Sequence, residues 1–110
     1  MPQPFTVVVS PAADADFDAI HAYVAAHASP AQADRLIADL LAKAAALATF
    51  PLRGPAPDEL AALGEYHYRQ ISVPPYRMFY EVIGTTVLIS LVVDGRRDLP
   101  ELLARRLLAR

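Results

Sequence analysis

Two adjacent arginines, Arg96 and Arg97, stand in the segment Asp94-Gly-Arg-Arg-Asp98. Guanidinium groups are fixed positive charges, and their donor forks match the oxygens of phosphates and carboxylates. The pair therefore predicts a contact with an anionic group. Asp94 and Asp98 could instead act as local counter-charges in a solvated turn, and this alternative is favoured because most surface charges only interact with water.

Two further arginines, Arg69 and Arg77, lie among tyrosines of the same half of the chain. Together with Tyr80, they could form a platform on which a ligand stacks. The stronger interpretation is that tyrosines in a sheet pack half-buried, with the hydroxyl at the edge. Strand alternation puts Arg77 and Glu81 on one face, so we expect these two to form an ion pair.

Other kinds of chemistry lack the necessary residues. There is no cysteine, and the three histidines, His21, His27 and His67, do not have metal-ligand spacing. The sequence contains no nucleophile elbow, phosphate-binding loop or dinucleotide fingerprint. We therefore predict no metal site, no cofactor and no catalytic residue.

Charge and length limit the class of protein. The net charge is -2 and the isoelectric point is about 5.8, whereas proteins that follow nucleic-acid backbones usually carry a basic excess. Direct, sequence-specific nucleic-acid binding is therefore not expected. A length of 110 residues predicts one domain, 1–110. No signal peptide or membrane-spanning run is recognisable, which predicts a cytoplasmic protein without membrane association.

The first half of the chain predicts a strand and two helices. Phe5 to Val9 is β-branched, and Ser10-Pro11 has the cap and first-turn residues of a helix. Ser29-Pro30-Ala31-Gln32 begins a second helix at once, so the two form a hairpin. Its apolar stripes include Phe17, Ile20, Val24, Leu36 and Leu40.

The second half predicts an antiparallel meander followed by a helix. Tyr66–Val73, Tyr76–Ile83 and Thr86–Val93 alternate like strands, and the third is apolar on both faces, so it should be covered. Leu99–Leu108 can form a short helix with Leu102 and Leu103 inward. The expected fold is α+β, with the helical hairpin on one face of a curved sheet and the other face open to a partner.

The order and spacing of several segments resemble toxins of the ParE/RelE superfamily, which belong to type II toxin-antitoxin modules. The matching segments run along nearly the whole chain and are Ser10-Pro11-Ala12-Ala13-Asp14, Ile20 to Tyr23, Leu47-Ala48-Thr49-Phe50-Pro51 to Gly54, Tyr76-Arg77-Met78-Phe79-Tyr80-Glu81-Val82 and Gly95-Arg96-Arg97-Asp98. The resemblance implies the RelE/ParE-like α+β fold.

The two branches of the superfamily differ in their chemistry. The RelE branch cleaves ribosome-bound mRNA with two lysines, arginines and a tyrosine, but Tyr68, Gln70 and Leu103 stand at the lysine and tyrosine positions here. Only Arg77 and Arg97 remain, and arginines can hold a phosphate but cannot exchange protons at neutral pH. The resemblance therefore points to the ParE branch, which is associated with inhibition of DNA gyrase. Asp94 replaces a histidine that many relatives carry.

This resemblance implies a non-enzymatic toxin that binds DNA gyrase, arrests growth and is neutralised by a ParD-like antitoxin of the ribbon-helix-helix type in a hetero-oligomer. The expected target contacts are Arg77, Arg96, Arg97, Arg69 and Tyr80. The expected antitoxin contacts are Phe17, Ile20, Val24, Leu36, Leu40, Leu102 and Leu103. The alternatives are a ribosome-dependent mRNA endonuclease that uses Arg77 and Arg97 with His67 as base, and a non-toxic module that only binds an antitoxin.

Overall fold

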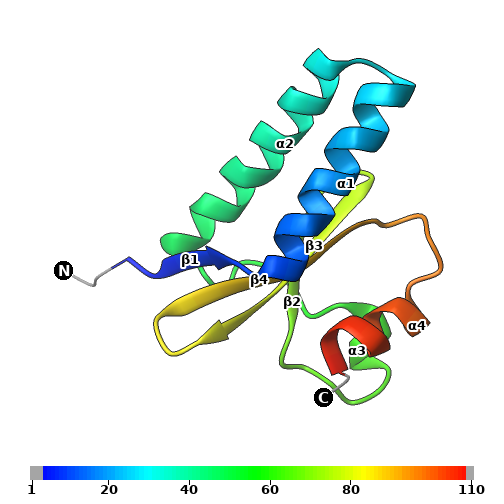
Figure 1. Cartoon of the computed structure of the whole chain (residues 1–110). Coiled ribbons are helices and arrows are strands. Elements are labelled where there is room, and N and C mark those ends of the chain that lie inside the picture. Colours follow the sequence, from blue (N-terminus) through cyan, green and yellow to red (C-terminus); the bar gives the residue numbers. More distant parts are fainter. Residues whose placement is uncertain (1–3, 109–110) are drawn as a thin grey trace.

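A computed structural model describes residues 4–108. Four strands and two long helices dominate it (Figure 1). The elements are β1 (Thr6–Val9), α1 (Pro11–His27), α2 (Pro30–Ala45), a 3₁₀ turn (Ala46–Ala48), α3 (Asp58–Ala61), β2 (Arg69–Val73), β3 (Tyr76–Ile83), β4 (Thr86–Asp94), α4 (Pro100–Leu103) and a π-helical turn (Ala104–Leu108).

The strands form one mixed sheet in the order β1-β4-β3-β2. β2, β3 and β4 are antiparallel neighbours, as the meander predicted, and β1 pairs in parallel with β4. The apolar strand β4 is therefore interior, and the α+β fold class is confirmed.

Serine caps set the start of both long helices. The Ser10 hydroxyl oxygen accepts from the Ala13 backbone N–H at 3.1 Å, and the Ser29 hydroxyl accepts from Gln32 N–H at 3.1 Å. Each cap is followed by a proline in the first turn. The helices pack as an antiparallel pair above the sheet (Figure 1).

The helical hairpin and the sheet enclose the larger core. Met78 and Tyr80 of β3 and Val87, Ile89 and Val92 of β4 face the hairpin. The helices contribute Ala13, Phe17, Leu40 and Ala44 to this cluster, and the 3₁₀ turn contributes Leu47. Burial of these side chains supplies most of the attraction between hairpin and sheet.

A second core covers part of the opposite sheet face. Phe79, Leu91 and Val93 pack there against Leu60 of α3 and a group of leucines near the C-terminal end, Leu99, Leu102, Leu103 and Leu107. The expectation that this face is open was therefore wrong. The four leucines at the C-terminal end follow helical spacing and need an apolar surface, which the sheet provides.

A β-bulge lets β4 serve both cores. Phe79 pairs with Leu91 and Tyr80 pairs with Ile89, so Ser90 is an extra residue without a partner on β3. Side chains alternate along a strand, and one extra residue reverses the alternation. Val87 and Ile89 consequently face the hairpin, whereas Leu91 and Val93 face the second core.

One strand is shorter than expected. β2 begins at Arg69 and not at Tyr66, because Tyr66 is exposed and His67 turns to bind Glu81, with 2.6 Å between Nε2 and Oε2.

Among the described residues, no helix has the length and apolar character needed to cross a membrane.

Candidate protein-binding groove and arginine loop

A groove of about 420 Å³ lies between α1 and the C-terminal end of β4. Ile20 and Tyr23 line it from the helix, and Val92 lines it from the strand. Tyr23 is 59% exposed and its ring stacks on His27, with ring centroids 4.0 Å apart. Asp94 and Arg97 border the groove at one end, so it combines an apolar lining with a charged rim.

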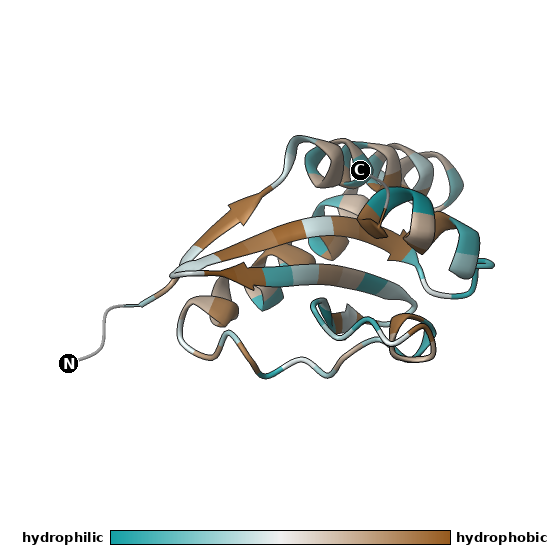
Figure 2. Ribbon diagram, turned by 90° about the horizontal axis from the view of Figure 1, so that it is seen from below, coloured by the Kyte–Doolittle hydropathy of each residue, from teal (hydrophilic) through white to brown (hydrophobic). Residues whose placement is uncertain are grey.

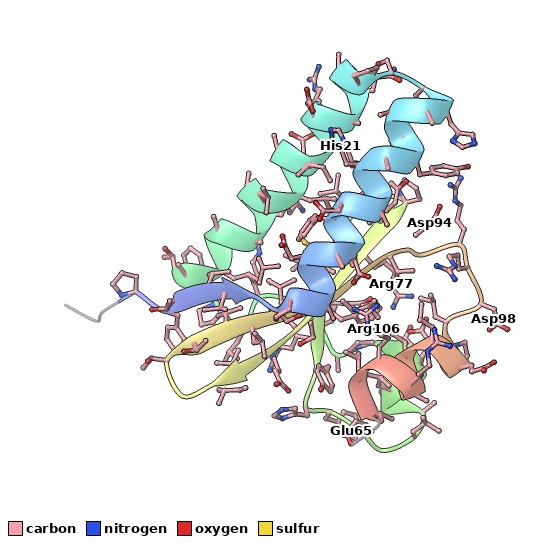
Figure 3. The ribbon with its side chains drawn as sticks, in the orientation of Figure 1. His21, Glu65, Arg77, Asp94, Asp98 and Arg106 are labelled. Carbon is pink, nitrogen blue, oxygen red and sulfur yellow. The ribbon has the colours of Figure 1, made fainter. Side chains whose placement is uncertain are left out.

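The rim is the arginine loop, Asp94–Arg97, which leaves β4 beside α1 (Figure 3). The Gly95 N–H donates to the Pro75 carbonyl at 2.7 Å, which holds the loop against the turn before β3. A Cβ at this position would lie 2.6 Å from Arg77 Cδ and 3.0 Å from the Pro75 oxygen. A contact of 2.6 Å does not occur, so another residue at position 95 would displace either the Arg77 side chain or the loop.

Asp94 binds one of the two loop arginines. Its carboxylate accepts from the Arg96 backbone N–H at 2.9 Å, from Nε at 3.0 Å and from Nη2 at 2.7 Å. Hydrogen bonds from Arg96 hold the pKa of Asp94 below its ordinary value, and they raise the pKa of Arg96. The counter-charge predicted for this turn is thus present at Arg96, whose side chain is still 75% exposed.

Arg97 differs from its neighbour. Its backbone N–H donates to the Asp94 carbonyl at 3.2 Å, but no ion pair holds its guanidinium within residues 4–108. This side chain is exposed and lines the groove. Arg97 is therefore the loop cation available to an anionic partner.

Arg77 is instead part of the folded framework. Its guanidinium donates to both Glu59 oxygens at 2.7 and 2.9 Å and to Gln70 Oε1 at 2.7 Å, and it lies 4.9 Å from the Phe79 ring centroid. The hydrogen bonds from Arg77 lower the pKa of Glu59. The predicted pair with Glu81 was wrong, because residues four apart on a strand are about 13 Å apart, and Glu81 binds His67.

Tyr80 and Arg69 also serve the framework. Tyr80 is fully buried, and its hydroxyl oxygen accepts from the Gly54 N–H at 3.1 Å. Burial raises the pKa of this hydroxyl. Arg69 donates from Nη1 to the carbonyls of Leu52 at 3.0 Å and Gly54 at 2.8 Å. Neither Tyr80 nor Arg69 is placed as expected of a target contact, since both hold the segment before α3.

The predicted antitoxin residues lie mainly in the two cores. Phe17 and Leu40 belong to the hairpin core, and Leu102 and Leu103 belong to the second core. Their amphipathic pattern reflects packing on the sheet, so these four do not form a surface for a partner. Val24 and Leu36 are partly buried against the hairpin core, and Ile20 is partly buried there and also lines the groove.

One structural pair was missed by sequence reasoning. Arg106 donates to both oxygens of Asp16 at 3.0 and 2.8 Å and to the Ser90 carbonyl at 3.2 Å. Asp16 also accepts from the Val92 N–H at 3.1 Å. These bonds satisfy the Ser90 carbonyl and the Val92 N–H of β4, which lie beyond the end of β1 and beside the bulge. No local signal connects residues so far apart in sequence.

The three residues of the nuclease alternative, His67, Arg77 and Arg97, lie in different places. His67, the proposed base of the nuclease alternative, lines a different hollow together with Glu81. Arg97 lines the groove beside α1, and Arg77 is held by Glu59. Within residues 4–108 these three side chains therefore do not share one hollow. The arrangement can hold an apolar segment that carries a carboxylate or phosphate.

A helical hairpin on one face of a four-stranded sheet, with a short C-terminal helix on the other, defines an α+β protein of the RelE/ParE-like fold. A solved structure of a chromosomal ParDE TA system from P. aeruginosa contains a similar chain, with a TM-score of 0.69 and 19% identity. The match covers 82% of this chain and 95% of that chain.

The family of the chain follows from its sequence. The model of the family described as ParE toxin of type II toxin-antitoxin system, parDE, matches residues 7–99. The chain therefore belongs to the ParE toxin family. No curated protein sequence matches it.

Proposed function

We propose that the chain is a cytoplasmic toxin that inhibits DNA gyrase by binding and not by catalysis. The observation that carries this proposal is membership of the ParE toxin family over residues 7–99. The arrangement of the arginines supports it, since Arg77 is held within the fold while Arg97 is available at the groove. Of the predicted target contacts, Arg96 and Arg97 keep this role in the proposal.

We infer that a ParD-like antitoxin of the ribbon-helix-helix type neutralises the toxin in a hetero-oligomer. Its apolar segment would lie in the groove, on Ile20 and Tyr23, with an acidic side chain at Arg97. Exposed apolar surface bordered by polar groups is typical of partner sites. An antitoxin in this position would cover Arg97, so neutralisation would follow from competition for one arginine.

Purified chain and gyrase test the target. We expect inhibition of supercoiling that increases with the concentration of the chain and is weakened by Arg97→Glu. Arg105→Glu is the matched control, because Arg105 is exposed on the C-terminal turn and does not line the groove. If gyrase kept its full supercoiling activity at a large excess of the chain, and no complex between the two were detected, gyrase would not be the target.

Expression in cells separates the alternatives. Growth arrest with filamentation and a DNA-damage response supports gyrase inhibition. New mRNA ends in the ribosomal A site would show the nuclease alternative, and normal growth would show a module that only binds an antitoxin. Co-expression of the antitoxin should restore growth, and Tyr23→Ala should weaken the rescue.

A further inference from the structure

Two large apolar side chains, Phe50 and Leu52, are exposed next to each other on the segment that joins α2 to β2. Phe50 is 64% exposed and Leu52 is 60% exposed. They line an open hollow of about 580 Å³ together with Arg53. Figure 2, coloured by hydropathy, shows that hydrophobic residues occur in connecting segments as well as in the strands and helices. Neighbouring apolar side chains on a surface often mark a protein-binding site.

The backbone that carries these side chains is fixed to the sheet. Arg69 binds the carbonyls of Leu52 and Gly54, and the Tyr80 hydroxyl binds the Gly54 N–H. Gln70 N–H donates to the Pro55 carbonyl at 2.9 Å. Since a Cβ on Gly54 would lie 2.3 Å from the Gln70 oxygen, only glycine allows this close approach. The exposed pair is therefore presented by a preorganised segment, which lowers the entropy cost of binding.

Positive charge lies near the exposed pair. Lys43 and Arg53 line a second hollow of about 460 Å³, and Arg53 belongs to both hollows. Neither side chain has an ion pair within residues 4–108. Asp39 is the one acid in the linings of these two hollows. The guanidinium of Arg69 binds the carbonyls of Leu52 and Gly54, and among the described residues no ion pair neutralises it.

We propose that Phe50 and Leu52, together with Lys43 and Arg53, form a docking surface for an acidic protein segment that carries a bulky apolar side chain. The apolar side chain would lie on Phe50 and Leu52, and carboxylates on either side would face Lys43 and Arg53. The surface is separate from the groove beside α1, since no residue lines both.

A protein partner fits this surface better than a single-stranded nucleic acid. Nucleic-acid grooves combine several aromatic rings with a line of cations. Here one ring, that of Phe50, lies beside the aliphatic Leu52, and the chain is acidic overall with an isoelectric point of about 5.8. An aliphatic and aromatic pair suits an apolar side chain, and isolated cations suit carboxylates.

The test is an NMR titration of the ¹⁵N-labelled chain with a short synthetic peptide in which leucine and phenylalanine alternate with pairs of glutamate. We expect saturable shifts centred on residues 49–53 and 42–46. Added salt should weaken binding, because screening reduces attraction between exposed charges. A peptide with glutamine in place of every glutamate should bind about tenfold more weakly or not at all.

Matched variants localise the effect. The double variant Lys43→Glu with Arg53→Glu, and separately Phe50→Ser, should each weaken peptide binding by about tenfold or more. Arg35→Glu should not, because Arg35 is exposed on α2 and lines neither hollow. Unchanged spectra away from the surface show that each variant is folded.

Three results would overturn the proposal: no saturable binding, shifts centred on the groove or the arginine loop, or equal binding of the glutamine peptide. Tighter binding of a single-stranded oligonucleotide at the same residues would overturn the choice of partner. Each measurement is direct binding, so it stands whether or not the chain arrests growth.

Discussion

The arginines of the molecule divide into two regions with opposite roles. Arg69, Arg77 and Arg106, together with Tyr80, form an anchoring network in which each polar group binds an acceptor or donor from a distant segment. The arginine loop, Asp94–Arg97, binds mainly to itself and leaves Arg97 at the groove. The role of an arginine here is set by its neighbours and not by its residue type, which is the same in both regions.

The largest effect is expected in the anchoring network, at Tyr80. Tyr80→Ala removes a fully buried ring and should lower the free energy of unfolding by about 3–5 kcal/mol. Tyr80→Phe keeps the ring but leaves the Gly54 N–H without its acceptor, so we expect a loss of about 1–3 kcal/mol. Urea denaturation measures both. If Tyr80→Phe left the free energy of unfolding unchanged, the hydroxyl would not hold the segment before α3.

Arg77→Ala should have the next largest effect, about 1–3 kcal/mol, because it leaves the Glu59 carboxylate without its charged donor. The pair is only partly buried, which keeps the loss below that of a fully buried ion pair. A double-mutant cycle with Glu59→Gln measures the coupling between the two residues. Additive effects would show that the pair contributes no coupling.

Acid should weaken the same pair. The pKa of Glu59 is lowered in the folded chain, so its carboxylate stabilises the fold above its unfolded pKa of about 4.5, and this stabilisation is lost as pH falls through the lower folded value. The difference in stability between wild type and Glu59→Gln should therefore shrink below about pH 4.5. Thermal unfolding at a series of pH values measures it. A difference in stability that stays constant across these pH values would show that the Glu59 carboxylate does not stabilise the fold through Arg77.

The smallest effect is expected in the arginine loop. Arg96 is exposed and its partner is two residues away, so Arg96→Ala should leave the melting temperature unchanged within measurement error. Arg97→Ala should also leave the melting temperature unchanged, but it should weaken the complex with the antitoxin. A large loss of stability in either variant would remove the distinction between the two regions.

Sequence reasoning predicted the elements well because their signals are local. Ser10-Pro11 and Ser29-Pro30 begin the helices where expected, and the third strand of the meander is interior. The sites were harder because pairing depends on distant residues. Tyr80 binds Gly54, and Asp16 binds Arg106. Amphipathic spacing also could not distinguish a face that packs on the sheet from one that binds a partner, as Phe17 and Leu40 show.

The extra residue in β4 decides which face of the sheet each later side chain of the strand takes. If β4 kept all its residues but had no bulge, unbroken alternation from Val87 and Ile89 would turn Leu91 and Val93 toward the hairpin and Val92 away from it. Deleting Ser90 would leave Leu91 and Val92 opposite Phe79 and Met78, as they are now, but it would remove the carbonyl that Arg106 binds. Substitutions at position 90 keep this carbonyl, so they should be tolerated better than the deletion, and the backbone at the bulge, more than its side chain, constrains how this strand can vary.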